Sequence, residues 1–217
     1  EGGGKVQHGK GGTGIAITEL TSSNRFMDAE GSGLLHRTAW AGAGTGVLLY
    51  DPLNEGAIVR NDQYIFTEWD PTARGDLEAL RNVFDSNGDG VFTSADAKFA
   101  LFKIEVTNAD GTTSVMTLAQ AGITSINLKA DLTNVQYADG SAITGQTTFT
   151  RTGGSTGTVA NTSLASESAG YAVTKLVSTD ASGNRVVTNT AFAADGSIAE
   201  VVKSVTSPSG NNITNSF

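Results

Sequence analysis

Apolar and polar residues alternate in short runs along most of the chain, which is the pattern of β-strands with one buried face. Residues 104–107 alternate in this way, residues 47–50 form a short apolar run, and residues 114–118 and 123–128 are predicted as further strands. Clusters of glycine, asparagine and aspartate separate the runs and indicate tight turns. The pattern therefore predicts a mostly β chain built from short strands and hairpins.

One stretch has the spacing of helices instead. Residues 77–84 repeat apolar side chains at helical intervals, and Asp70 followed by Pro71 is a typical helix start. A second apolar run, residues 97–102, predicts a second, short helix. Because a polar loop separates the two, we predict an EF-hand-like helix–loop–helix inside the β-rich chain. The expected fold class is therefore α+β, mostly β.

The C-terminal part has a different character. It is rich in Thr and Ser, and the turn glycines Gly183, Gly196 and Gly210 lie 13 and 14 residues apart. This spacing suggests a strand–turn–strand repeat. We therefore expect two domains: residues 1–145 as an EF-hand-like calcium-binding module, and residues 146–217 as a β-repeat extension.

The loop of residues 85–96 carries the strongest chemical signal. Calcium prefers six to eight hard oxygen ligands, and short acidic or amide side chains at alternate loop positions can supply them. Gly90 lies at the sixth position, where such loops turn sharply, and Thr93 lies at the ninth. The predicted ligands of a Ca²⁺ ion are Asp85, Asn87, Asp89, the backbone carbonyl of Val91, and Asp96.

The last ligand position departs from the usual pattern. Asp96 stands where a bidentate Glu is common, and its side chain is one methylene shorter. We therefore expect affinity in the range of extracellular modules, on the order of 10⁻⁴ to 10⁻³ M or somewhat tighter. The alternative is a polar turn in which Thr93 and Asp96 form a capping box for the following helix. The two interpretations are compatible with each other.

Several weaker patterns favour ordinary turns. The segments that begin at Asp28 and Asp51 resemble degenerate calcium loops but lack some oxygen ligands. Residues 9–14 match G-x-G-x-x-G without the strand and helix that a nucleotide-binding site needs. His8 and His36 are too few for a zinc site.

Composition narrows the class of protein. The 217 residues carry a net charge of −8 and contain no Cys, and Lys and Arg form no cluster. We therefore expect no nucleic-acid partner, no thiolate chemistry and no disulfides. No run approaches the roughly 20 apolar residues of a membrane span. The chain starts at Glu1 without a signal peptide, so we expect it to be part of a larger polypeptide.

Three segments carry a family resemblance: MDAEGSGLLHRTAWAGAGTGVLLYD, LEALRNVFDSNGDGVFTSADAKFALFKIEV and LAQAGITSINL. Over residues 13–130 the chain resembles a calcium-binding module of large RTX-type (repeats-in-toxin) secreted bacterial proteins, and it is similar to their self-processing module. The resemblance implies type I secretion, an extracellular or cell-surface location, and folding triggered by calcium outside the cell. It also implies cleavage of an Asp-Pro bond before the module, yet no Asp-Pro precedes residue 13.

The leading hypothesis is a structural module that binds Ca²⁺, is stabilised by it and is not an enzyme. A second hypothesis is calcium-dependent self-processing at Asp51–Pro52 or Asp70–Pro71. A third is an adhesin or carbohydrate-binding module with Trp40 or Trp69 on a flat face, although both tryptophans are better explained as core residues. The sequence does not identify a surface or glycan partner.

Overall fold

The computed structural model describes residues 5–9, 14–193 and 197–216, with side chains described from residue 14 onward. Strands account for 44% of the structure. Contacts divide the chain into two units. Unit 1 comprises residues 1–23 and 38–166, and unit 2 comprises residues 24–37 and 167–217.

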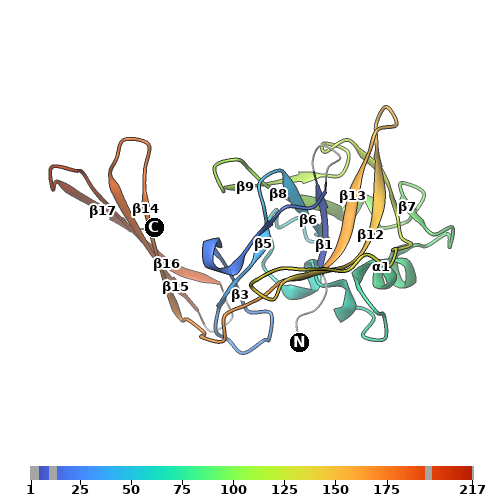
Figure 1. Ribbon diagram of the computed structural model, residues 1–217, viewed down its shortest axis with the longest axis horizontal. Helices are drawn as coiled ribbons and strands as arrows, with labels where there is room; N and C mark the ends of the chain where they lie inside the picture. Colours follow the sequence, from blue (N-terminus) through green and yellow to red (C-terminus); the bar gives the residue numbers. More distant parts are fainter. Residues whose placement is uncertain (1–4, 10–13, 194–196, 217) are drawn as a thin grey trace. The chain divides into compact units, whose positions relative to one another are not determined.

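The elements follow the chain in short steps (Figure 1). The strands are β1 (Lys5–Gly9), β2 (Ile17–Thr18), β3 (Arg25–Met27), β4 (His36–Thr38), β5 (Trp40–Ala41), β6 (Thr45–Tyr50), β7 (Val91–Thr93), β8 (Phe102–Thr107), β9 (Thr113–Thr117), β10 (Ile123–Asn127), β11 (Val135–Gln136), β12 (Ala142–Arg151), β13 (Thr156–Ser163), β14 (Val173–Thr179), β15 (Arg185–Phe192), β16 (Ile198–Thr206) and β17 (Asn212–Ser216). The helices are α1 (Asp76–Phe84) and the 3-10 turns η1 (Leu20–Ser22), η2 (Asn61–Gln63), η3 (Phe66–Glu68) and η4 (Phe99–Leu101).

Unit 1 is organised around one antiparallel sheet. Its order is β7-β10-β12-β13-β1-β6-β8-β9, and β11 adds to β12. The four runs predicted as strands at residues 47–50, 104–107, 114–118 and 123–128 correspond to β6, β8, β9 and β10, which confirms them as strands. In β8 the apolar residues Phe102, Ile104 and Val106 alternate with polar ones, whereas β6 is buried at every residue, with an apolar run at residues 47–50.

The core of unit 1 is a cluster of aromatic rings. Phe102 lies at its centre, with ring centroids 4.7 Å from Phe92, 5.1 Å from Phe84 and 5.0 Å from Tyr50. Phe84 directly precedes the predicted calcium loop, Phe92 lies at its eighth position, and each is at most 1% exposed. The first part of the loop is therefore held between two residues of the same core.

A close backbone approach explains one glycine in the sheet. A Cβ on Gly46 in β6 would lie 2.7 Å from Cγ1 of Ile104 in β8. That distance is too short for any side chain, so only glycine fits beside Ile104. Ile104 is fully buried, and the missing Cβ leaves the space that it fills.

The predicted EF-hand-like helix–loop–helix is wrong. Among the described residues, α1 is the one helix with seven or more residues. The loop runs from α1 into the strand β7, where Phe92 pairs with Ile126 of β10. Residues 97–102, predicted as the second helix, form only the short turn η4 and the start of β8. Pairing with the sheet outweighs the helical spacing of this short apolar run.

The helix also begins later than Asp70 and Pro71 predicted. Asp70 accepts hydrogen bonds from the backbone N–H and hydroxyl of Thr72 at 3.1 and 2.6 Å, which makes a turn. Helix α1 starts at Asp76 after Gly75, which has no side-chain cap. Oδ1 of the buried Asn161 in β13 accepts the backbone N–H of Leu77 at 2.9 Å. A strand distant in sequence therefore caps this helix.

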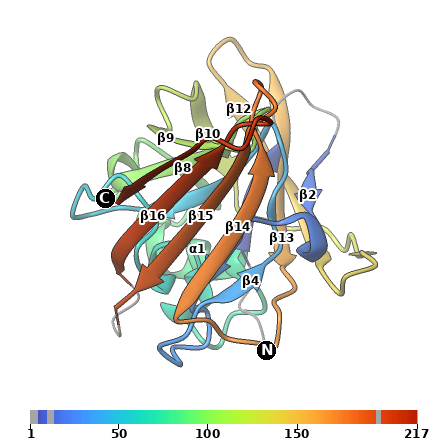
Figure 2. The ribbon, with the colours of Figure 1, turned by 90° about the vertical axis from the view of Figure 1, so that its left-hand side faces the viewer.

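Unit 2 contains a four-stranded antiparallel meander. Its order is β14-β15-β16-β17, so neighbours in sequence are neighbours in the sheet (Figure 2). Gly183 and Gly210, with φ of 79° and 90°, lie in the turns of two of its hairpins. The third predicted turn glycine, Gly196, lies outside the described residues. Elsewhere in the chain, β3 pairs with β4, and in unit 1 β2 pairs with β5.

The two units differ from the predicted domain limits. The expected boundary between residues 145 and 146 lies inside β12, which runs without a break from Ala142 to Arg151. Contacts instead place the division at residue 166, and they assign residues 24–37 to unit 2.

Candidate functional site

The candidate site is the loop between α1 and β7. Its first residue, Asp85, follows the helix directly and donates its backbone N–H to the Leu80 carbonyl at 3.2 Å. On the other side, the N–H of Leu128 donates to the Gly90 carbonyl at 3.0 Å. The helix and the sheet thus fix the positions of both ends of the loop.

The Asp85 carboxylate closes the first half of the loop. Oδ1 accepts the N–H of Gly88 at 2.9 Å, and Oδ2 accepts the N–H of Gly90 at 2.8 Å. Both glycines have positive φ, 73° and 80°, a region in which other residues are strained. The two glycines thus allow the backbone to turn around the carboxylate.

Asn87 and Asp89 form a second set of contacts. Oδ1 of Asn87 accepts the N–H of Asp89 at 3.0 Å, and Oδ1 of Asp89 accepts the N–H of Val91 at 2.8 Å. The Asn87 amide also donates from Nδ2 to Oδ2 of Asp89 at 2.9 Å. The side chains at the first, third and fifth loop positions therefore lie on the inside of the turn and hold its backbone.

Asp96 fastens the two ends of the loop to each other. Its Oδ1 accepts the N–H of Ser86 at 2.8 Å, and its Oδ2 accepts the N–H of Thr93 at 2.8 Å. Asp96 is only 4% exposed. The bond to Thr93 is one half of the predicted capping box, but the Thr93 hydroxyl accepts from Ala95 and no α-helix follows.

Ser86 is a loop residue that the sequence pattern did not single out. Its hydroxyl accepts the N–H of Ala97 at 3.0 Å, and its own N–H is held by Asp96. A serine at the second loop position carries no distinctive signal, because loops tolerate many residues there. Only the three-dimensional arrangement shows that it connects the loop to the segment beyond it.

The loop in this form does not display a carboxylate-rich metal cluster. Across the described residues, no three His, Cys, Asp or Glu side chains lie close enough together to hold a metal ion. Of the predicted side-chain ligands, Asn87 and Asp89 bond to each other, and Asp85 accepts backbone N–H groups of the same turn. Asp96 is directed to backbone N–H groups instead.

The two weaker loops share one local arrangement. In unit 2, Asp28 accepts the N–H groups of Ser32 and Gly33, each at 2.8 Å. In unit 1, Asp51 accepts the N–H groups of Glu55 and Gly56 at 2.8 and 2.9 Å. Each carboxylate therefore caps the backbone four and five residues ahead, which is the role of a turn residue.

Asp51 has a further partner, Lys103 of β8. The Lys103 ammonium lies 2.6 Å from Oδ2 of Asp51 and 2.6 Å from Oδ1 of Asn54, whose φ is +56°. Burial alone would raise the pKa of Asp51, but the bonds from Lys103, Gly56 and Glu55 lower it below its usual value. This carboxyl is therefore an ionised member of a buried ion pair.

The two Asp-Pro sequences differ in setting. Asp51 is buried at 2% exposure, and both its carboxylate oxygens accept hydrogen bonds. Asp70 lies at the surface, where the side chains of Asn82 and Thr72 donate to it and lower its pKa. Both carboxylates therefore accept hydrogen bonds from groups further along the chain.

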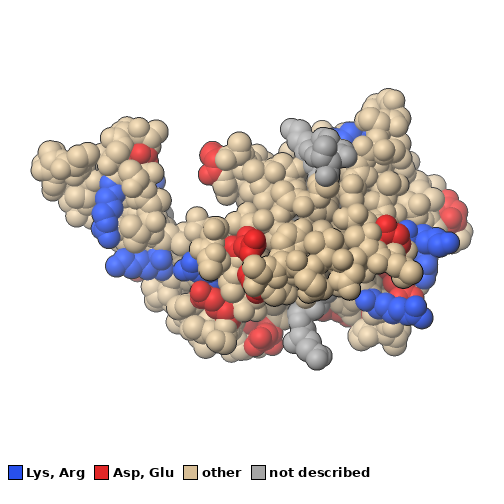
Figure 3. All heavy atoms as spheres, in the orientation of Figure 1, with Lys and Arg blue, Asp and Glu red and all other residues tan. Residues whose placement is uncertain are grey.

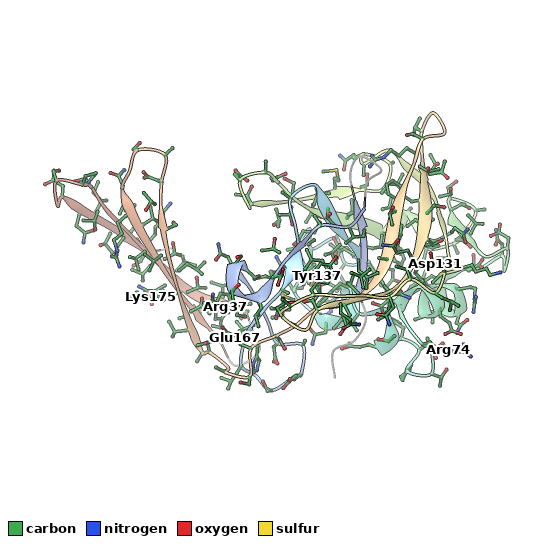
Figure 4. All side chains as sticks on the ribbon, viewed as in Figure 1. Arg37, Arg74, Asp131, Tyr137, Glu167 and Lys175 are labelled. Carbon is green, nitrogen blue, oxygen red and sulfur yellow. The ribbon has the colours of Figure 1, made fainter. Side chains whose placement is uncertain are left out.

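His36, Trp40 and Trp69 each lie within hydrogen-bonding distance of a neighbouring protein group. In unit 2, Nδ1 of His36 lies 2.9 Å from the Glu167 carbonyl, and Nε of Arg37 lies 3.6 Å from the Glu167 carboxylate (Figure 4). In unit 1, Trp40 is 4% exposed and donates to Glu105 at 3.1 Å. Trp69 is 41% exposed but donates to the Asp62 carbonyl at 2.8 Å. The side chain of His8 and residues 10–13 lie outside the described part of the chain.

One face of the molecule is drawn with its charged side chains marked (Figure 3). On the face drawn in Figure 3, most of the surface is uncharged, and Lys, Arg, Asp and Glu side chains are scattered in small groups of both signs. In the part of the chain that is described, no helix has the length and apolar character needed to cross a membrane.

Comparison with known proteins identifies the family. Residues 10–165 match the SPM domain family, so the chain belongs to that family. It is also 29% identical over 150 residues to the iron-regulated protein FrpA of Neisseria meningitidis serogroup C. The alignment covers 65% of this chain but 13% of that protein, so the chain spans only a small part of its relative's length.

Proposed function

We propose that this chain is a structural calcium-binding module of a large secreted or surface bacterial protein, and that Ca²⁺ stabilises it outside the cell. The observation that carries the proposal is the loop between α1 and β7. There, oxygens of Asp85, Asn87 and Asp89 accept backbone N–H groups of one turn, which lies between the buried Phe84 and Phe92. Membership of the SPM domain family and similarity to a much longer bacterial protein support the proposal that the chain is one module of a large bacterial protein.

The donor chemistry of the loop fits calcium. The oxygens of Asp85, Asn87 and Asp89 are hard ligands, and each side chain keeps lone pairs beyond those bonded to backbone N–H groups. The Val91 carbonyl and Asp96 are the remaining proposed ligands. A bound ion would neutralise charge among the carboxylates and so hold α1 and β7 together. Because the loop joins a helix to a strand, the ion would stabilise the edge of the sheet at β7.

The test is a calcium titration of the chain by isothermal calorimetry, with thermal unfolding in calcium and in chelator. We expect about one ion per chain with a dissociation constant on the order of 10⁻⁴ to 10⁻³ M, and a higher melting temperature in calcium. Asp89→Ala should abolish the heat of binding. Asp110→Ala is the matched control, because Asp110 caps an exposed hairpin at Thr112 and lies outside the loop. Absence of binding at millimolar calcium would refute the proposal.

Calcium-dependent self-processing is a distinct alternative, and it makes a separate prediction. Cleavage at Asp70–Pro71 would use a carboxylate that Asn82 and Thr72 keep ionised at the surface. Incubation in calcium followed by gel electrophoresis would then show two fragments, and Asp70→Asn would prevent their appearance. An intact band after prolonged incubation would exclude this activity for the chain.

A further inference from the structure

The loop between α1 and β7 contains the dipeptide Asn87–Gly88, which has a covalent chemistry of its own. Both residues are exposed, and Gly88 has φ of +73°. Glycine has no Cβ, so its backbone nitrogen approaches the preceding side chain with little steric hindrance. An exposed asparagine before glycine is therefore the arrangement in which an asparagine side chain most readily reacts with its own backbone.

The reaction is a deamidation that needs only water. The Gly88 backbone nitrogen loses its proton and attacks Cγ of Asn87, and the bond from Cγ to Nδ2 breaks. Ammonia leaves, and a five-membered succinimide ring remains. Water then opens the ring at either carbonyl carbon, giving an aspartyl residue or an isoaspartyl linkage through the side chain. No oxidant, reductant or cofactor takes part.

Three hydrogen bonds of the closed loop oppose the first step. The Gly88 N–H donates to Oδ1 of Asp85 at 2.9 Å, so its proton is held by an anion. Oδ1 and Nδ2 of Asn87 bond to Asp89 at 3.0 and 2.9 Å, which fixes the rotation of the amide. The side chain therefore cannot turn its carbon toward the Gly88 nitrogen until these contacts break.

We propose that Asn87 is a spontaneous deamidation site protected by the closed loop, so that the rate of modification reports how often the loop opens. Asp96 controls opening, because it holds Ser86 and Thr93 together across the loop. Loss of that connection frees the segment that carries Asn87 while leaving the Asn-Gly sequence intact.

The product would make the loop harder to close. In the encoded protein, Nδ2 of Asn87 donates to Oδ2 of Asp89 at 2.9 Å. A carboxylate at position 87 has no proton to donate at neutral pH, so two negative groups would face each other at that contact. An isoaspartyl linkage would also add one carbon to the backbone between the two positions. Deamidation is therefore a one-way change that opens the loop further.

The rate is measured by incubating the full chain near neutral pH in chelator and following the mass of the peptide that contains Asn87. We expect the chain unfolded in urea to deamidate at Asn87 about tenfold or more faster than the native chain, with Asp96→Asn between them. Asn108, which precedes Ala109, is the internal control in the same digests and should change little. Equal rates in native and unfolded chains, or no acceleration by Asp96→Asn, would overturn the proposal.

The consequence of the product is tested with Asn87→Asp. In chelator this variant should lower the melting temperature by about 2–4 °C. Asn108→Asp is the matched control, because Nδ2 of Asn108 donates to the hydroxyls of Thr112 and Ser114, which are neutral. An unchanged melting temperature for Asn87→Asp would refute the predicted repulsion. Neither measurement uses calcium, so the result does not depend on whether the loop binds it.

Discussion

The two units use the same element, the antiparallel strand, with very different cores. In unit 1, Phe66, Phe84, Phe92, Phe102 and Phe149 are each at most 1% exposed. In β14–β17 of unit 2, the buried residues among those described are Thr174 and Val187. Val173, Val177, Ile198 and Ile213 are instead more than half exposed.

The contrast shows that strand pairing and core formation are separable. The meander in unit 2 is fully paired: Val177 lies opposite Val187, and Val205 lies opposite Ile213. Even so, its strands bury little apolar surface. Unit 1 combines its ladder with a packed aromatic cluster. Since apolar burial is the main favourable term in folding, we expect unit 1 to hold most of the stability.

The most severe test of this contrast is Phe102→Ala. Phe102 contacts four other rings in unit 1, so its removal should cost about 3–5 kcal/mol of unfolding free energy. Val177→Ala in unit 2 is the contrasting variant and should change stability by less than about 0.5 kcal/mol. Chemical denaturation monitored by circular dichroism measures both. Similar losses for the two variants would mean that the meander has a core of its own.

The next largest effect concerns the ion pair in unit 1. Lys103→Ala leaves the Asp51 carboxylate buried beside Asn54 without its cation, and we expect a loss of about 3 kcal/mol. Lys175→Ala in the exposed meander, a lysine labelled in Figure 4, serves as the control and should be nearly neutral. If Lys103→Ala is also neutral in urea denaturation, the pair contributes nothing to unit 1.

The same pair gives unit 1 a pH dependence. The pKa of Asp51 is lower in the folded chain than in the unfolded chain, so its contribution is present above the unfolded pKa. That contribution is lost as the pH falls through the folded pKa. Stability measured between neutral pH and acid should therefore decline, and Asp51→Asn should decline less steeply. Parallel curves of stability against pH for the unmodified chain and Asp51→Asn would show that Asp51 does not cause the decline.

A smaller effect is expected at the candidate site. Gly90 has φ of +80°, and a Cβ added there would have no atom within 4 Å, so Gly90→Ala meets backbone strain and no clash. We expect a loss of about 1 kcal/mol in thermal unfolding. The control is Gly75→Ala, where a Cβ would lie 2.7 Å from Nδ2 of Asn161 and the cost comes from crowding at the start of α1. Tolerance of Gly90→Ala would show that the loop adapts without its left-handed turn.

The smallest expected effect compares one turn in each unit. Asp110 in unit 1 and Asp180 in unit 2 both accept the N–H two residues ahead, at 3.0 and 2.9 Å. Removal of either carboxylate should cost about 0.5–1 kcal/mol of local stability. Hydrogen exchange should show the loss confined to the hairpin in each case. A loss that spreads through β14–β17 after Asp180→Ala would mean that turns, and not a core, hold unit 2.

Much of the fold could be predicted from alternation, because a strand with one buried face has a period of two wherever it lies. The run that became β8 is of this kind, whereas the run at residues 47–50 in β6 is apolar throughout and buried at every residue. The second helix was predicted wrongly because residues 97–102 are too short for helical spacing to decide, and Phe102 pairs with Tyr50 at the start of β8. Asn161 as the cap of α1 could not be predicted, since it lies 84 residues from Leu77.

The candidate site was only partly accessible from the sequence. Spacing places Asp85, Asn87 and Asp89 on the inside of one turn, and the structure has them bonded to its backbone. The same spacing does not show where Asp96 directs its oxygens, because that depends on how the segment after β7 returns. Calcium binding itself stays a prediction for the titration to decide.

The position of β1 has a consequence for the order of folding. β1 lies between β13 and β6, with Val6 opposite Asn161 and Gln7 opposite Val47. Strand β1 can therefore pair with both of its neighbours only after residues 156–163 exist, whereas each hairpin of the meander needs only its immediate neighbours. Closing so long a loop costs entropy before any contact is gained. During synthesis β1 must wait for β13, so the large sheet becomes continuous only after Ser163 has been made.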